Sequence, residues 1–341
     1  MSKLKVIHLI GSAASEFYCD LSRLYARDCL ENTANPELYE FHIAYITPDR
    51  AWRFPTSLSA SDIDAAPPLS IAQAIQTLQN LNIDVMLPQM FCVPGMTQYR
   101  NLFNLLNIPY VGNTADLMAL VADKAKTRSI VAAAGVAIPT GEVLQAGKLP
   151  SIDFPLVIKP LDTDNSIGVA LVKDATEWDA ALQIALTHGD RVLVEKFIEL
   201  GREVRCGIVE RAGELICLPL EEYALDANIR PIRSYADKLK KNAAGDLDFA
   251  AKDITKSWIV DPIDPITERV WAMARICHTA LGCRHYSLFD FRIDPQGNPW
   301  FLEAGLYCSF AKTSVLSEMA KAAGMPLNSF FDDLLHAAIA V

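Results

Sequence analysis

The sequence lacks the features that would place the protein in a membrane or make it a metal-thiolate protein. None of its apolar runs approaches the ~18 residues that a membrane-spanning helix needs. The first run covers only Val6 to Ile10 and is followed by Gly11 and a polar turn, which is not the pattern of a signal peptide. The eight cysteines show no CxxC or zinc spacing, so we expect buried thiols in a reducing cytoplasm.

An excess of positive charge is also missing. The formal net charge of the 341 residues is −10 and the pI is ≈ 5.1. No basic stripe covers a predicted domain, which argues against a nucleic-acid-binding protein. Internal repeats and low-complexity segments are absent. What is present is ordinary for a globular enzyme: 51% hydrophobic and 21% charged residues, in a chain long enough for two or three packed units.

The N-terminal third alternates between short apolar runs and amphipathic stretches. We predict strands at 6–10, 41–46, 84–87 and around 110–111, and helices at 71–81 and 97–106. This alternation is typical of a parallel sheet with crossover helices, in which ligands bind at the carboxyl ends of the strands. Ser12, Ser15 and Glu16 follow the first strand and are candidate substrate contacts, although a helix cap explains them equally well.

The middle of the chain carries a lysine, a Ser/Gly loop and two acids among apolar runs. We predict a helix over 115–134 interrupted at 123–124, strands at 154–160, 169–172 and 191–198, a helix at 177–187, and a further strand from 201. The loop at 161–168 ties two antiparallel strands together, and its backbone N–H groups can fold over a phosphate. Lys159, Glu195 and Glu203 lie at strand ends, where each alone is also explained as a solvated residue.

Strands dominate from Val204 onward, with a hairpin turn at 212–213. Residues 228–241, NIRPIRSYADKLKK, form the one basic patch of this acidic sequence. A mobile solvated loop explains that composition, and the functional alternative is a lid whose Arg233 and Lys238 close on anions. The last predicted helices lie at 265–281, 314–323 and 327–339.

Residues 287–309, SLFDFRIDPQGNPWFLEAGLYCS, predict a β-hairpin. Two cross-strand pairs follow from a turn centred on residues 296–297: Asp294 with Pro299, and Asp290 with Glu303. Alternation along the strands predicts an apolar face made of Phe289, Phe291, Ile293, Trp300, Leu302 and Ala304. The opposite face carries Asp290, Arg292 and Glu303.

Two carboxylates in opposed positions need a neutralising partner. Their Cβ atoms lie roughly 5 Å apart, and like charges at that separation repel. A protonated carboxyl, Arg292, or a divalent cation would each serve, and carboxylate oxygens completed by water and phosphate suit Mg²⁺. A hairpin with two solvated acids is the simpler alternative, and the hairpin alone does not decide between them.

The motifs gain meaning from their order: a Gly-Ser turn, Asp-Lys124, Ile-Lys159-Pro, Asn-Ser166-Ile-Gly168, Glu195-Lys-Phe197, Gly-Arg-Glu203, Tyr-Ala-Asp-Lys238, Asp290 and Glu303-Ala. This series resembles the ATP-grasp enzymes of the D-alanine–D-alanine ligase-like group over nearly the full chain. The resemblance implies an α/β and α+β fold of three units, at 1–114, 115–203 and 204–341, in which the last two clasp ATP.

The resemblance also implies roles for single residues. Those implied to hold the nucleotide are Lys124, Lys159, Asn165, Ser166, Gly168, Glu195, Phe197, Glu203 and Lys238. The implied Mg²⁺ ligands are Asp290 and Glu303, in agreement with the hairpin geometry. Substrate contacts are expected at Glu16, Arg233, Tyr235 and Ser314. The candidate catalytic groups are Lys238, Arg292 and Ser166.

Several positions depart from the family pattern. Gly305 stands where the family usually has an Asn as third metal ligand, and Leu288 stands where an arginine usually stabilises the transition state; Arg292 lies on the same charged face. The loop at 306–311 replaces the usual substrate loop. These changes argue against a D-alanine–D-alanine ligase. The family also places the residue before the second acid, Leu302, under adenine, but the predicted pleat turns it toward the core.

Four runs are similar to those of the D-alanine–D-alanine-ligase-like enzymes of mycosporine-like amino acid biosynthesis: HIAYITPDRAWRFP, MLPQMFCVPGMTQYR, EKFIELGREVRCGI and GCRHYSLFDFRIDPQGNPWFLEAGLYCSFA. The implied reaction uses ATP and Mg²⁺ to join an amino acid, typically serine or threonine, to mycosporine-glycine. The alternatives are a dipeptide or other amino-acid ligase that uses an acyl phosphate, and a nucleotide-binding protein without catalysis, for which the losses at 288 and 305 would be decay. The resembling ligases also suggest a homodimer formed through the N-terminal domain.

Overall fold

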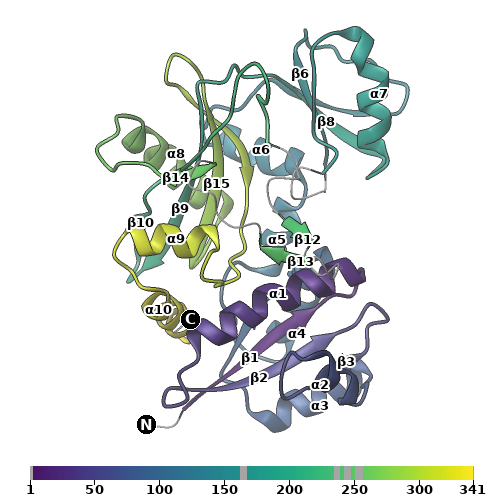
Figure 1. Ribbon diagram of the computed structural model, residues 1–341, viewed down its shortest axis with the longest axis vertical. Coiled ribbons are helices and arrows are strands. Elements are labelled where there is room, and N and C mark those ends of the chain that lie inside the picture. Colours follow the sequence, from purple (N-terminus) through teal and green to yellow (C-terminus); the bar gives the residue numbers. More distant parts are fainter. Residues whose placement is uncertain (1–2, 162–166, 234–238, 242–246, 250–255, 341) are drawn as a thin grey trace.

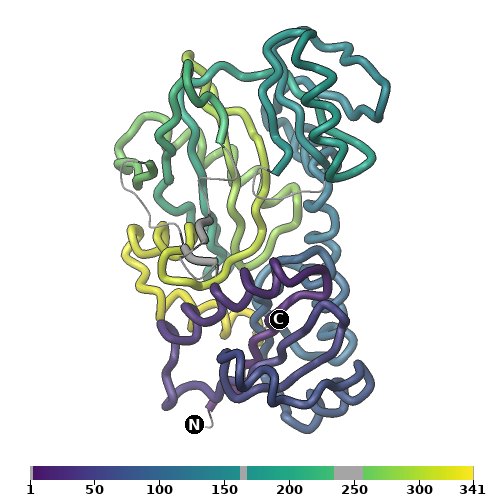
Figure 2. Tube along the Cα trace, turned by 45° about the vertical axis from the view of Figure 1, so that its right-hand side comes forward, coloured from purple at the N-terminus to yellow at the C-terminus, as the bar shows by residue number. Residues whose placement is uncertain are grey.

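The computed structural model describes residues 3–161, 167–233, 239–241, 247–249 and 256–340. Within them the chain forms three bodies, one at the bottom of Figure 1 and two side by side above it (Figures 1 and 2). The predicted combination of α/β and α+β units is confirmed. Among the described residues, no helix combines the length and the apolar character of a membrane span.

The N-terminal body is a four-stranded sheet of order β3-β2-β1-β4 with its helices. Its elements are β1 Leu4–Gly11, α1 Glu16–Thr33, β2 Tyr39–Ile46, β3 Trp52–Arg53, α2 Ala60–Ala65, α3 Ile71–Leu81, β4 Val85–Pro88, η1 Gly95–Tyr99 and α4 Arg100–Leu105. β1 pairs in parallel with β2 and β4, as the alternation predicts. The expected strand around Tyr110 is only a single bridge to Met86.

The second body is an antiparallel sheet of order β5-β8-β6-β7, covered by one helix. Two helices, α5 Ala115–Val121 and α6 Lys124–Ala133, precede β5 Gly141–Gln145, β6 Leu156–Pro160, β7 Ala170–Val172, α7 Ala175–Leu186 and β8 Arg191–Lys196. The predicted helix interruption is confirmed, because Asp123 caps α6 by accepting hydrogen bonds from the N–H groups of Ala125 and Lys126. Trp178 of α7 is buried against the sheet.

The third body holds the largest sheet, of order β14-β11-β9-β15-β16, with β10 beside β9. Its elements are β9 Arg202–Arg211, β10 Glu214–Cys217, β11 Glu221–Tyr223, β14 Ser257–Ile259, α8 Ile266–Leu281, β15 Tyr286–Ile293, β16 Pro299–Ala304, α9 Val315–Ala322 and α10 Leu327–Ile339. A separate pair, β12 Leu239–Lys241 and β13 Leu247–Phe249, lies beside α1 (Figure 1). α10 packs on α1 and β4, so the N- and C-terminal bodies share one hydrophobic core.

His8 is a buried titratable side chain of the N-terminal sheet. Its ring meets Phe41 edge-on with 4.7 Å between centroids, and neither ring nitrogen has a hydrogen-bond partner among the described residues. Burial lowers the pKa of His8 from 6.5 to about 3. Between these two values the unfolded chain binds the extra proton and the folded chain does not, so the free energy of unfolding decreases as the pH falls through this window.

We expect His8→Leu to remove this contribution to acid sensitivity. Between about pH 7.5 and about pH 5 the wild type should lose about 2 kcal/mol of unfolding free energy at this site, and the variant should not. Urea unfolding at the two pH values measures the difference, with His336→Gln, at an exposed position of α10, as the control. Equal losses in the wild type and in His8→Leu would contradict the assignment.

Candidate active site

The last hairpin brings Asp290 and Glu303 directly opposite each other, as the sequence predicts. Near the turn the register differs from the prediction, because Ile293, and not Asp294, pairs with Pro299. Asp294 instead begins the turn, where its carbonyl accepts a hydrogen bond of 2.8 Å from the N–H of Gly297. The turn is therefore one residue longer than predicted. Because Asp290 still pairs with Glu303, the register must shift by one residue between the turn and these acids.

This register shift occurs at a β-bulge in β16. Phe291 pairs with Phe301 and Asp290 pairs with Glu303, so Leu302 between them has no cross-strand partner. Phe301 is 2% exposed and belongs to the core of the third body, whereas Leu302 lines a cavity together with both acids. The prediction that Leu302 points into the core is wrong, because the bulge shifts the alternation by one residue.

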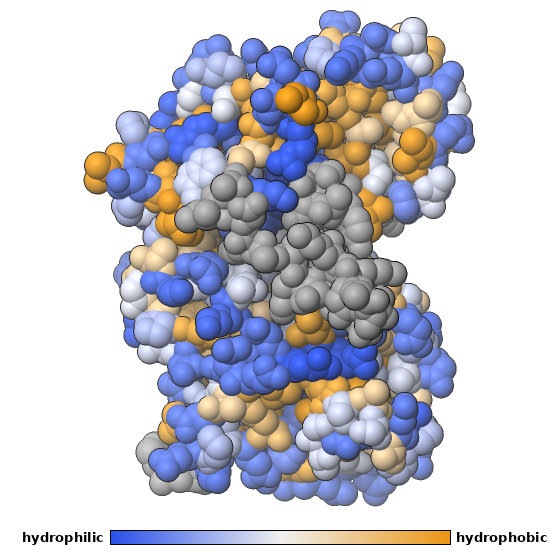
Figure 3. Space-filling view, in the orientation of Figure 1, coloured by the Kyte–Doolittle hydropathy of each residue, from blue (hydrophilic) through white to orange (hydrophobic). Residues whose placement is uncertain are grey.

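The cavity lies between the second and third bodies, where hydrophobic and hydrophilic surfaces meet (Figure 3). It encloses ≈ 800 Å³, including space open to solvent. Nine predicted site residues line it: Lys124, Lys159, Glu195, Phe197, Glu203, Arg233, Asp290, Arg292 and Glu303. Besides Phe197, the apolar part of its wall consists of Pro139, Val157, Val169, Ile198, Ile232 and Leu302. More than half of the lining residues are charged, and a cavity that combines apolar walls with convergent polar groups is typical of a small-molecule site.

Glu195 forms a buried ion-pair cluster at one end of the cavity. It lies on β8, and its Oε2 is 2.5 Å from the Nζ of Lys159 on the neighbouring strand β6. Its Oε1 is 3.2 Å from the Nε of Arg128 on α6. Because a buried carboxylate requires such partners, the cluster fixes the orientation of Glu195. Arg128 is not identified by the sequence, since one arginine in a polar helical stretch carries no signal.

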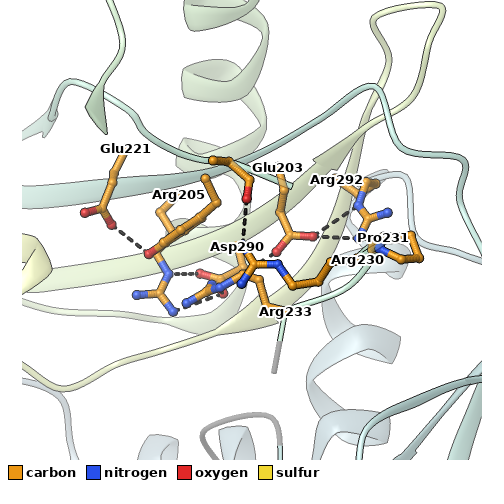
Figure 4. A network of polar contacts seen from close by, with 10 residues as sticks. Glu203, Arg205, Glu221, Arg230, Pro231, Arg233, Asp290 and Arg292 are labelled. Atoms are coloured by element: carbon orange, nitrogen blue, oxygen red, sulfur yellow. Dashed lines mark hydrogen bonds and ion pairs between the residues drawn. The ribbon is translucent and has the colours of Figure 1, made fainter. Parts of the chain in front are cut away.

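Glu203 and Arg292 form a second pair, in register across β9 and β15 (Figure 4). The Arg292 Nη2 and Nε lie 2.7 Å and 3.1 Å from Oε2 of Glu203. The guanidinium also donates hydrogen bonds to the carbonyls of Ile198 and Pro231. Arg292 therefore faces Glu203, and not the Asp290–Glu303 pair that it was a candidate to neutralise.

Other cations neutralise the two opposed acids. Asp290 accepts from Arg205, whose Nε is 2.7 Å from Oδ1, and from Arg233, whose Nη1 is 3.1 Å from Oδ2 (Figure 4). The Nζ of Lys124, at the start of α6, is 3.1 Å from Oε1 of Glu303. Arg233 also stacks on Tyr223, with 3.8 Å between its Cζ and the ring centroid. This stacking holds Arg233 at the cavity wall.

The donor set suits a divalent cation bound together with a phosphate. Asp290 and Glu303 offer carboxylate oxygens, and Mg²⁺ commonly takes one or two carboxylates with phosphate and water. Among the described residues, no group of three or more His, Cys, Asp or Glu is placed to hold a metal. In the ion pairs of the cavity-lining carboxylates, six cationic side chains meet four carboxylates, and two of the six, Arg128 and Arg205, lie just behind the cavity wall. This positive excess favours a polyanion.

Other predicted residues lie away from the cavity wall. Glu16 is exposed in the first turn of α1, where Ser15 caps the helix by accepting from the N–H of Tyr18. The Oγ of Ser314, at the start of α9, lies 2.7 Å from the Oγ of Ser317.

Gly168 has a positive φ of +72° beside Pro160, where a Cβ would come within 2.8 Å of a ring carbon. The loop therefore requires glycine at this position. Four further predicted site residues lie outside the described part of the chain: Asn165, Ser166, Tyr235 and Lys238.

Known proteins resemble this chain in sequence. Residues 141–336 match the family model described as the D-ala D-ala ligase C-terminus. A D-alanine–D-alanine ligase of Geobacter sulfurreducens is 29% identical over 248 residues, which cover 70% of this chain and 72% of that ligase. The vancomycin B-type resistance protein VanB of Enterococcus faecalis is 26% identical over 99% of both chains.

Solved structures share the fold. The VanG D-Ala:D-Ser ligase of Enterococcus faecalis superposes with a TM-score of 0.79 at 22% identity, covering 99% of this chain and all of that one. A D-alanine–D-alanine ligase of Bacillus anthracis, solved in complex with ATP, has a TM-score of 0.72 at 20% identity and covers 99% and 98% of the two chains. At these identities the likeness shows the ATP-grasp fold alone. With the family match over more than half of its length, the chain belongs to the D-alanine–D-alanine ligase family of ATP-dependent carbon–nitrogen ligases.

Proposed function

We propose that the protein uses ATP and Mg²⁺ to join an amino acid, serine or threonine, to mycosporine-glycine, with release of ADP and phosphate. The observation that carries the nucleotide part of this proposal is the cleft between the second and third bodies, whose four carboxylates are paired with a larger number of cations on and just behind its wall. We further propose that the chain consists of three domains, at residues 1–114, 115–203 and 204–341.

We assign separate groups of cleft residues to the base, the ribose and the phosphates of the nucleotide. Glu195 with Lys159 and the neighbouring Phe197 form the end for the base. Glu203, fixed by Arg292, is placed for ribose hydroxyls. When bound by Asp290 and Glu303, Mg²⁺ would offset phosphate charge during transfer.

Lys124 and Arg233 are the cations of this cleft that can turn from these carboxylates to phosphate oxygens. Phosphoryl transfer depends mainly on such positioning and charge stabilisation.

The acceptor part of the proposal rests on the resembling runs and on the departures at 288 and 305. Leu288 is buried in the shared hydrophobic core, and the N–H of Gly305 donates to the carbonyl of Leu288 at 2.8 Å. The expected arginine and asparagine thus have no equivalent side chain at these positions. The ring ketone of mycosporine-glycine is conjugated to an enamine and carries less charge than a carboxylate, so its activation needs less neutralisation there.

In the proposed reaction the ketone oxygen attacks the γ-phosphorus of ATP, and the bond to the bridging oxygen of ADP breaks. The amine of the amino acid then adds to the ring carbon. Phosphate leaves with the former ketone oxygen, and loss of the amine proton gives an imine.

A dipeptide ligase is the second candidate, because the relatives described above include D-alanine–D-alanine ligases. The two differ in the first acceptor. In the dipeptide reaction a carboxylate receives the phosphoryl group and an acyl phosphate forms, whereas the proposed reaction activates a ring ketone.

One experiment separates the candidates. We expect ATP, Mg²⁺ and mycosporine-glycine with serine or threonine to give ADP and the ultraviolet shift of ketone-to-imine conversion. D-alanine alone should give no ADP above background. ADP release with D-alanine alone, and none with mycosporine-glycine, would replace the proposal with the dipeptide ligase. Nucleotide binding without ADP formation across the panel would favour a non-catalytic protein.

A further inference from the structure

Arg205 lies beside the candidate metal acid but outside the nucleotide cavity. It faces Asp290 in register across β9 and β15, and both Nε and Nη2 contact the carboxylate, at 2.7 Å and 3.3 Å. Asp290 and Arg233 line the cavity described above, and Arg205 does not. Asp290 therefore contacts one cation that lines the nucleotide cleft and one that does not.

The surroundings of Arg205 lead to the N-terminal body. Burial raises the pKa of Tyr25 on α1, and the nearby charge of Arg205 offsets part of that rise. The Tyr25 ring meets Phe91, just after β4, with 5.3 Å between centroids, and Phe91 meets Tyr307, just after β16, at 5.6 Å. Phe91 follows the carboxyl end of β4, a strand of the parallel N-terminal sheet, and the carboxyl edge of a parallel sheet is where such folds bind ligands.

We propose that Arg205 binds an anionic oxygen of the acceptor substrate, on the side of Asp290 opposite the nucleotide. A phosphoryl group that crosses from the nucleotide to the acceptor must pass close to the cation-binding acid, so the acceptor has to lie at its far side. Arg205 is held there by a regular strand, and its planar guanidinium can engage two oxygens at once. The inference rests on the proposed function only in requiring an acceptor that reacts beside Asp290.

On this face of β9 and β15, the residues next to Arg205 and Asp290 supply no other positive charge for an acceptor. Leu288, the next residue on the same face of β15, is apolar and buried, and Gly207, its partner on β9, has no side chain. Arg292, the next residue in the other direction, is bound to Glu203 on the nucleotide side. Within this strand pair, Arg205 is therefore the cation that an acceptor carboxylate or activated ring oxygen can reach from the N-terminal body.

The test compares two arginines of the same sheet, each paired with a carboxylate. We expect Arg205→Gln to raise the KM for the acceptor at least about tenfold, the loss typical of a charge-assisted hydrogen bond, with the KM for ATP changed less than about twofold. Arg292→Gln should show the reverse pattern. Arg205→Lys should recover part of the acceptor affinity because it keeps the charge. Arg211→Gln, at the exposed end of β9, is the neutral control.

Calorimetric titration of the acceptor into protein loaded with Mg²⁺ and a non-hydrolysable ATP analogue gives the same comparison without turnover. The acceptors are mycosporine-glycine, serine, threonine and D-alanine. The affinities of the wild type and of Arg205→Gln are compared for each acceptor that the wild type binds. If only D-alanine binds, the proposed function fails and Arg205 is judged on D-alanine. Unchanged acceptor affinity in Arg205→Gln, a rise confined to ATP, or binding of none of the four by the wild type overturns the inference.

Discussion

The Glu303→Ala variant should lose at least about a thousandfold of the acceptor-dependent ADP release, since it removes one of the two carboxylates that we propose as metal ligands. The same change leaves Lys124 without its carboxylate partner at 3.1 Å. Without the Glu303 carboxylate, the Lys124 ammonium group would no longer be held in a fixed position for binding phosphate. Because the Glu303 side chain is 34% exposed, the fold should tolerate its removal.

The measurement is coupled-enzyme detection of ADP with and without the acceptor, and circular dichroism shows whether the variant is folded. Glu214→Ala removes an exposed glutamate of β10 in the same sheet and should retain full activity. A folded Glu303→Ala protein with wild-type turnover would refute the metal assignment. Raising the Mg²⁺ concentration should recover little activity, because the variant lacks one of the two proposed ligands.

The second large effect is expected at Lys159. We expect Lys159→Met to weaken ATP binding at least about a hundredfold, because the lysine is a buried cation at the cavity wall and no water can replace its charge there. Lys159 is 8% exposed, and its loss leaves Glu195 with Arg128 alone among its described ion-pair partners. The methionine keeps most of the volume of the side chain, so packing in the second body should change little.

Titration with a fluorescent ATP analogue measures this loss directly and needs no acceptor. Lys173→Met, at an exposed position just after β7, removes an equal charge from the same body and should bind like the wild type. Wild-type affinity in Lys159→Met would place the nucleotide elsewhere. A loss of thermal stability without a loss of affinity would make Lys159 a structural partner of Glu195 only.

The hairpin shows how far sequence reasoning reaches. Alternation correctly placed Phe289, Phe291 and Ile293 in the core and Asp290 on the opposite face. It failed beyond the turn, where the side chain of Trp300 is only half-buried and donates its Nε1–H to Asp294. Turn length and bulge position depend on packing against the rest of the sheet, and a single strand pattern does not encode that packing.

Arg128 and Arg205, which the sequence analysis did not identify, share one property. Each contacts a carboxylate that is far away in the chain. Arg205 is 85 residues from Asp290, and its contact with that carboxylate follows from the pairing of β9 with β15. Local patterns predict strands well but leave open which strands are neighbours. Lys159, Glu195 and Glu203 were found because their order along the chain resembles a known family, and spacing alone would not have selected them.

The extra residue at Leu302 has a consequence for how this hairpin tolerates change. Without it, the pairing of Ile293 with Pro299 would continue in step and bring Glu303 opposite Phe289, whose side chain is fully buried. A single-residue deletion or insertion between the turn and Glu303 would therefore turn a carboxylate into an apolar interior, whereas a change of two residues would keep it facing its partner. The odd or even length of this arm is as much a requirement of the site as the identity of the two acids.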